Sequence, residues 1–167
     1  MTRNISDLKT NAIRILDQAR IPYALRTYEV DENDLSAESV AVKIGLPPKQ
    51  VFKTLIAQGD VTGYLFALLP AGTELNPRLL AKASRNKRVE VVPLRDVQAI
   101  TGYIRGGVSP LAAKRAYPVF ADETLQLWET VSISAGVRGL QILLSPTDLL
   151  RITAATLTDL IRLHENL

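Results

Sequence analysis

The sequence contains no cysteine and a single histidine, His164, close to its C-terminal end. Without cysteine the chain has no disulfides, no thiolate metal sites and no cysteine nucleophile. A histidine near a chain end is expected to be a loosely held surface residue. These absences exclude a Ser-His-Asp triad and most zinc chemistry, and we expect no metal site.

Familiar nucleotide-binding and hydrolytic motifs are also missing. No glycine-rich loop ends in Gly-Lys-Ser/Thr, and the pair Gly106–Gly107 does not fit Gly-x-Gly-x-x-Gly. Carboxylate neighbours such as Asp31–Glu32 lie in polar, turn-like stretches, where capping or solvation explains them. We therefore expect no cofactor and no standard catalytic constellation.

Long hydrophobic runs and a signal peptide are absent as well. No apolar run approaches the roughly 18 residues that span a bilayer, and the first residues contain no apolar segment of the signal-peptide type. Together with the lack of cysteine, this predicts a cytoplasmic protein without a membrane partner. The net charge of +3 is compatible with a polyanionic partner. The basic residues at 82–88 and 114–115 could be either a solvated face or an RNA contact.

What is present suffices for one self-contained domain. Hydrophobic residues make up 47% of the 167 residues against 22% charged residues, which is enough to build a core. No repeat, low-complexity tract or polar linker interrupts the chain, so we expect a single domain over 1–167. Helical spacing or capping signals predict helices at 5–19 with Ser6 as N-cap, at 36–44, from Asn76–Pro77 onward, at 94–100, at 147–152 and, as a turn or two, at 157–163. Alternating or apolar runs predict strands at 23–30, 51–58, 63–69, 88–92, 118–121, 129–134 and 140–144.

The order of these elements indicates the fold class. Strands and helices alternate irregularly, and Gly59–Asp60 separates two strands closely enough for a hairpin. A mixed or antiparallel sheet is therefore favoured over a Rossmann sheet, and the chain is predicted to be α+β.

Three features stand out against this background. Lys53 interrupts the otherwise apolar strand at 51–57, either as a lysine whose ammonium reaches water or as a cation held in a pocket. The segment 101–110 is a loop in which Gly106–Gly107 could be a structural turn or an anion-binding nest of backbone amides. The third feature, a small-residue turn that begins at Ser134, is adequately explained as a hairpin connection.

Taken together and in order, these segments resemble one family. Val-Phe-Lys-Thr-Leu at 51–55, Gly-Tyr-x-x-Gly-Gly-x-Ser-Pro at 102–110 and Ser-Ala-Gly-Val-Arg-Gly at 134–139 are similar to the YbaK/EbsC family of aminoacyl-tRNA deacylases. This family is related to the editing domain inserted in some prolyl-tRNA synthetases. The likeness extends from the predicted first helix almost to the end of the chain, including Thr27-Tyr28-Glu29.

The resemblance implies a fold, an activity and a set of site residues. The implied fold is a single α+β domain with a mixed, barrel-like sheet surrounded by helices. The implied activity is hydrolysis of the ester that joins a mischarged amino acid to tRNA, above all cysteine on proline tRNA, with the substrate's own thiol as attacking group, and prolyl-tRNA synthetase is a potential partner. The implied catalytic residues are Lys53, Gly106 and Gly107; the implied substrate-binding residues are Tyr28, Leu35, Ser109, Pro110, Ser134, Ala135 and Gly136.

Chemistry and resemblance agree on one point. An aminoacyl ester is already activated, so a protein without a nucleophile–base pair can cleave it by orienting the ester and stabilising the oxyanion. Two departures from the family pattern, Leu35 in place of an aromatic residue and Ala135 in place of a glycine, leave alanine or serine open as the amino acid removed. The alternatives are a non-catalytic module that binds tRNA ends or nucleotides, and a hydrolase of small phosphorylated or acylated metabolites.

Overall fold

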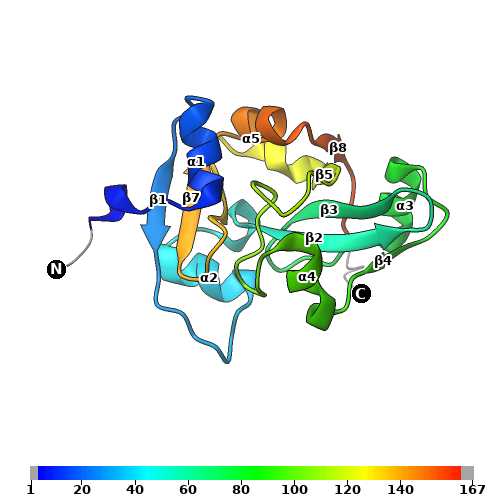
Figure 1. Ribbon diagram of the computed structural model, residues 1–167, viewed down its shortest axis with the longest axis horizontal. Coiled ribbons are helices and arrows are strands. Elements are labelled where there is room, and N and C mark those ends of the chain that lie inside the picture. The colour runs from blue at the N-terminus through cyan, green and yellow to red at the C-terminus, as the bar shows by residue number, and fades with distance from the viewer. Residues whose placement is uncertain (1–3, 163–167) are drawn as a thin grey trace.

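The computed structural model describes residues 4–162 (Figure 1). Its helices are α1 (Asn11–Gln18), α2 (Ala37–Ile44), α3 (Pro77–Ser84), α4 (Val97–Thr101) and α5 (Pro146–Thr153), with 3-10 turns η1 (Ile5–Asp7), η2 (Pro48–Gln50), η3 (Leu94–Asp96) and η4 (Glu123–Leu127). Its strands are β1 (Ala24–Thr27), β2 (Phe52–Gly59), β3 (Gly63–Pro70), β4 (Val89–Val91), β5 (Val119–Asp122), β6 (Val131–Ser134), β7 (Leu140–Leu144) and β8 (Thr156–Thr158). The chain is thus α+β, as the sequence predicts.

Side-chain caps set the start of most helices. The Oγ1 atom of Thr10 accepts a hydrogen bond from the Ile13 amide at the start of α1, and Ser36, Asn76 and Ser145 cap α2, α3 and α5 in the same manner. The helix predicted at 5–19 is therefore too long. Thr10, rather than Ser6, is the N-cap, because the chain is extended at Leu8 and Thr10 between η1 and α1.

The strands form two open sheets, and the predicted barrel is not found. One sheet has the order β1-β7-β6 with antiparallel pairs, and the other has the order β4-β2-β3-β5-β8 with both antiparallel and parallel pairs. In the described part of the chain, one isolated bridge, between Val51 and Ser132, connects them. The sheets are separate because β2 continues its hydrogen bonding with β3 and β4 rather than with β6. The predicted hairpin is confirmed, with Gly59 opposite Gly63.

The main core lies between the two sheets. Phe52, Ile56 and Phe66 from the larger sheet are buried together with Ile133 and Ile142 from the smaller one. A second cluster, under α3, covers the opposite face of the larger sheet, and a third lies under α2. Strand β2 consequently has one face toward the smaller sheet and the other toward α3, and this placement positions the site described below (Figure 1).

The C-terminal part differs from the prediction. The segment predicted as helix at 157–163 contributes β8, which pairs in parallel with β5. Beyond it, the Leu160 amide donates to the buried Asp122 carboxylate, and Ile161 bridges Leu75. Thr156 and Thr158 are β-branched and favour this extended conformation. His164 lies outside the described residues. None of the helices in the described part is long and apolar enough to cross a membrane.

Candidate active site

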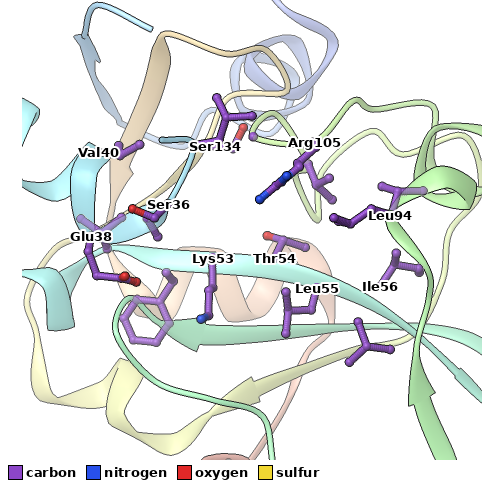
Figure 2. A pocket seen from close by; sticks show the side chains of 18 of the residues that line it. Ser36, Glu38, Val40, Lys53, Thr54, Leu55, Ile56, Leu94, Arg105 and Ser134 are labelled. Atoms are coloured by element: carbon purple, nitrogen blue, oxygen red, sulfur yellow. The ribbon is translucent and has the colours of Figure 1, made fainter. Parts of the chain in front are cut away.

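A cavity of about 390 Å³ opens beside β2. Its walls come from the start of α2, from β2, from the segment at 91–97 that enters α4, from the loop at 105–108, and from Ser134 and Gln141 of the smaller sheet. Figure 2 shows that the two ends of the cavity differ in polarity. The polar residues Ser36 and Glu38 lie at one end, and the apolar residues Leu94 and Ile56 lie at the other. The cavity therefore offers a polar end and an apolar end to one ligand.

Lys53 lines this cavity from the strand that the sequence predicts. The side chain is half-buried, and its ammonium donates a hydrogen bond to the carbonyl oxygen of Thr73, 2.6 Å away. An ammonium has three donors. A cation thus lies at the edge of the cavity with hydrogen-bonding capacity beyond the bond to Thr73.

Thr54 leaves β2 on the side opposite to Lys53 (Figure 2), as neighbours on a strand must. Its Oγ1 atom is hidden from solvent and, within the described part of the chain, has no hydrogen-bond partner. Thr54 also lines the cavity. Sequence reasoning placed this residue in the motif at 51–55 but gave it no role, because a threonine in a strand is usually there for its β-branched shape.

The predicted glycine loop packs against the turn that follows Ser134. Gly106, at φ +84°, lines the cavity, and a Cβ atom there would lie 3.4 Å from Nε of Arg138. A Cβ atom on Gly107 would lie 3.3 Å from the backbone of Val137, and the Gly107 amide donates to the carbonyl of Ile104. Gly107 thus allows a close backbone approach, and its amide is already engaged within the loop.

Ser109 and Pro110 support the loop from behind. Ser109 is fully buried, and its hydroxyl accepts a hydrogen bond from the Leu111 amide at 3.3 Å. Pro110 borders a second hollow near Ala113 and Tyr117 rather than the cavity beside β2. The structure therefore places Gly106 in the wall of the cavity and these two residues outside it.

Of the predicted residues in the third segment, Ser134 lines the cavity. Its hydroxyl accepts a hydrogen bond from the Gly136 amide at 3.1 Å. Ala135 is fully buried, and its amide donates to Leu140. Gly136, at φ +95°, lies against the ring of Tyr103, where a Cβ atom would be 2.9 Å from Cε1. Ala135 and Gly136 shape the turn that carries Ser134.

The last two predicted residues lie on different sides of the wall. Leu35 lines the cavity and contacts the loop, since a Cβ atom on Gly106 would be 3.5 Å from its Cδ2. Tyr28 packs under α2 in the cluster that contains Val40 and Val51. Because Val40 and Val51 line the cavity, Tyr28 supports the wall from the outer side.

Several polar lining residues were not found from the sequence. Figure 2 shows the Arg105 side chain reaching into the cavity between Ser134 and Thr54. Glu38 lies at the polar end and accepts a hydrogen bond from the Gly72 amide at 2.7 Å. The side chain of Gln141 is buried, and its Oε1 atom accepts from the Ser132 hydroxyl at 2.8 Å. Arg105 falls within the glycine motif, which is the one sequence signal that could have identified it.

Two ionisable groups next to the cavity residues in the sequence have shifted pKa values. Hydrogen bonds from the Ser36 side chain and amide lower the pKa of the Asp34 carboxyl below its ordinary value. In the loop, burial raises the pKa of Tyr103, whose hydroxyl donates to the Leu111 carbonyl. Among the residues that line the cavity, Glu38 has an acidic side chain at the polar end, and Lys53 and Arg105 have basic side chains.

Comparisons with known proteins agree with this arrangement. The family model described as "aminoacyl-tRNA editing domain" matches residues 31–152, which include the cavity residues from β2, the glycine loop and Ser134. A protein of Enterococcus faecalis, named as a candidate Cys-tRNA(Pro)/Cys-tRNA(Cys) deacylase, EbsC, is 42% identical over 153 residues, covering 92% of this chain and 93% of its own.

Solved structures share the fold. A crystal structure described as a candidate trans-editing enzyme for prolyl-tRNA synthetase has a TM-score of 0.77 at 22% identity, covering 93% of this chain and 99% of its own. A hypothetical protein has a TM-score of 0.83 at 20% identity, covering 92% of this chain and all of its own. The family match and the sequence relative confirm the resemblance noted from the motifs: the chain belongs to the YbaK/EbsC family of aminoacyl-tRNA editing domains.

Proposed function

We propose that this protein is a trans-editing deacylase that removes cysteine from mischarged proline tRNA. The family assignment and the printed name of the Enterococcus faecalis relative support this activity. The observation that carries the proposal is the convergence of three segments distant in sequence: Lys53, Gly106 and Ser134 line one cavity. An editing enzyme needs a cation, a backbone donor and a small-side-chain pocket around one ester, and this cavity provides all three.

The cavity suits an aminoacyl adenosine laid along its length. The amino acid occupies the polar end, where Glu38 lies (Figure 2). The Glu38 carboxylate then pairs with the α-ammonium group. Leu94, 61% exposed at the other end (Figure 2), and Val91, which also lines the cavity and is 48% exposed, give the adenine base an apolar surface. The ester then lies in the middle, near Thr54 and Arg105.

Within this arrangement Lys53 and Gly106 act on the ester. Lys53 holds the phosphate of the terminal adenosine or the ester carbonyl by charge, and the Gly106 amide donates to the carbonyl oxygen as negative charge develops on it. The Gly107 amide could add a second donor after exchanging its bond to Ile104. Ser134 and Leu35 border the amino-acid side chain. Tyr28, Ala135 and Gly136 pack behind these two residues. Ser109 and Pro110 support the glycine loop.

The proposed nucleophile is the cysteine thiol of the substrate. Its sulfur forms a bond to the carbonyl carbon, the ester C–O bond breaks, and the thiol proton goes to the departing 3′-oxygen of the tRNA. Water then opens the resulting thiolactone. This route needs a positioned ester and no protein nucleophile, which matches the lining residues Lys53, Gly106 and Ser134.

Recognition of the tRNA itself relies on charge. Arg85, Lys87 and Arg88 are exposed next to β4, whose end contributes to the cavity wall, and we assign to them contacts with phosphates. Proline tRNA, a docking contact with prolyl-tRNA synthetase and residence in the cytoplasm are part of the same proposal. Deacylation that weakens steeply between low and moderate salt would support the phosphate contacts.

The test is a deacylation assay with a panel of charged tRNAs. Proline tRNA carrying cysteine, alanine, serine or proline, and cysteine tRNA carrying cysteine, are incubated with the purified protein. Selective loss of cysteine from proline tRNA is expected. Faster loss of alanine would contradict the thiol as nucleophile and require a bound water. Binding of RNA without hydrolysis of any member would contradict the enzyme and favour a binding module.

A further inference from the structure

The hydroxyl of Thr54 is a buried polar group that has no hydrogen-bond partner among residues 4–162. Its Oγ1 atom is hidden from solvent and makes no hydrogen bond to any residue of the described chain. A buried hydroxyl without a partner is destabilising, and natural proteins contain few of them. Other buried hydroxyls of this chain are paired: Thr101 donates to Val97 at 2.8 Å, and Ser84 donates to Leu80 at 2.7 Å.

The surroundings of Thr54 point to the cavity as the source of the missing partner. Thr54 lines the cavity, and its strand neighbours Phe52 and Ile56 are apolar and buried. In Figure 2 the oxygen of Thr54 is directed toward the end that carries Ser36, and its methyl group toward Leu94. The hydroxyl therefore faces the end where the amino acid lies under the proposed function.

We infer that Thr54 is a specificity-determining residue whose hydroxyl hydrogen-bonds the side chain of the amino acid to be removed. The ligand chemistry is a short side chain that ends in an S–H or O–H group, hence cysteine or serine rather than alanine. This inference rests on the proposed function and deepens it, because it names the feature by which the pocket separates these amino acids. Apolar walls alone discriminate poorly between side chains of similar size.

The energetics favour selection by an otherwise unpaired hydroxyl. When a substrate with a hydrogen-bonding side chain binds, both polar groups are satisfied. When alanine binds, the Thr54 hydroxyl stays unpaired. A neutral hydrogen bond changes affinity by about 3–10-fold, and selection of that size is expected from Thr54 alone.

The test compares Thr54→Val and Thr54→Ser with the wild type. Valine has nearly the shape of threonine without the hydroxyl, and serine keeps the hydroxyl without the methyl group. For Thr54→Val, affinity is expected to fall about 3–10-fold for proline tRNA that carries cysteine or serine through a non-hydrolysable amide, and to stay within about 2-fold for the alanine counterpart. Thr54→Ser should retain the wild-type order of the three substrates.

Thermal unfolding adds a readout that does not depend on substrate. Because Thr54→Val removes an unpaired buried hydroxyl, its Tm should stay equal or rise by on the order of 2 °C. Thr101→Val is the matched control: it removes a buried hydroxyl that donates to Val97 and accepts from the Tyr103 amide. Its Tm should fall by several degrees.

The outcomes separate this inference from the proposed function. Wild-type protein that releases none of the amino acids contradicts the deacylase itself. Active wild type together with equal losses for all three substrates in Thr54→Val, or with no loss for any, overturns the role of Thr54 and leaves the deacylase standing. A clear fall in Tm for Thr54→Val would also overturn it, since the hydroxyl would then have a structural partner.

Discussion

The ammonium of Lys53 on β2 donates a hydrogen bond to the carbonyl oxygen of Thr73, 2.6 Å away in the loop that joins β3 to α3. Glu38 reaches the same loop from α2 and accepts a hydrogen bond from the Gly72 amide at 2.7 Å. Both side chains line the cavity. One short loop thus helps to hold two opposite charges at the edge of the site.

Two substitutions of Glu38 separate its charge from its bond to the loop. Glu38→Gln keeps an acceptor for the Gly72 amide, whereas Glu38→Ala removes it. If the carboxylate binds the α-ammonium group, both variants should raise KM for charged tRNA by about 3–10-fold. Hydrogen exchange of the Gly72 amide should accelerate in Glu38→Ala alone. Full activity of Glu38→Gln would show that the charge is not used.

The two predicted serines should differ in what they affect. Ser134 lines the cavity, so Ser134→Ala is expected to lower kcat/KM by about 3–10-fold with a small change in stability. Ser109 is fully buried behind the loop, so Ser109→Ala should cost about 1–2 kcal/mol of unfolding free energy. Denaturant unfolding and deacylation kinetics measure both. A fall in kcat/KM for Ser109→Ala at unchanged stability would instead place that hydroxyl in contact with substrate.

Gly136 is expected to tolerate no side chain. Its φ of +95° strains other residues, and a Cβ atom would be 2.9 Å from the Tyr103 ring. Gly136→Ala should lower the unfolding free energy by about 2–4 kcal/mol. Gly63→Ala is the matched control, since Gly63 also has a positive φ, +75°, but nothing lies within 4 Å of the added Cβ. Gly63→Ala should lower the unfolding free energy by only about 1 kcal/mol.

A double-mutant cycle identifies the clash. If the ring causes the extra loss in Gly136→Ala, the extra loss should disappear when Tyr103→Ala is present as well. Additive effects of the two substitutions would contradict the contact.

The lowered pKa of Asp60 should make the stability of the protein depend on pH. Hydrogen bonds from the amides of Arg88 and Lys87 lower the pKa of this carboxyl below its ordinary value of 3.8. In the window below that value the unfolded chain binds more protons than the folded one, so stability falls as pH decreases through it. Asp60→Asn keeps an acceptor without a titratable group. The decrease in stability between about pH 4 and 2 should therefore be shallower in Asp60→Asn, and an unchanged slope would contradict this role.

Local patterns predicted much of the site. Lys53 could be identified because a charge on an otherwise apolar strand is unusual, and Gly106 and Ser134 could be identified through their motifs; all three line the cavity. Thr54 could not be identified from the sequence, because the lack of a hydrogen-bond partner for its hydroxyl is a property of the packed structure. Ser109, Pro110 and Gly136 belong to the same motifs as the lining residues, but only packing shows that they face away from the cavity.

The fold shows the same division between local and long-range information. The cap at Asn76 and the hairpin at Gly59–Asp60 depend on neighbouring residues and were predicted. The separation into two sheets and the parallel pairing of β8 with β5 depend on partners more than 30 positions away. Periodicity alone carries no information on such partners, and so the helix predicted at 157–163 was wrong. The barrel-like sheet that the family resemblance implied was also wrong, because the two sheets of the described residues stay open.

The most direct test of the account is the rate at which cysteine leaves proline tRNA in the presence of wild-type protein, Lys53→Ala and Lys49→Ala. Lys49 is an exposed lysine in η2, just before β2, and serves as the control for loss of a positive charge. We predict rapid release by wild type and Lys49→Ala, and release at the no-enzyme rate by Lys53→Ala, with all three proteins folded by circular dichroism. Wild-type release no faster than without enzyme, or full activity of Lys53→Ala, would contradict it.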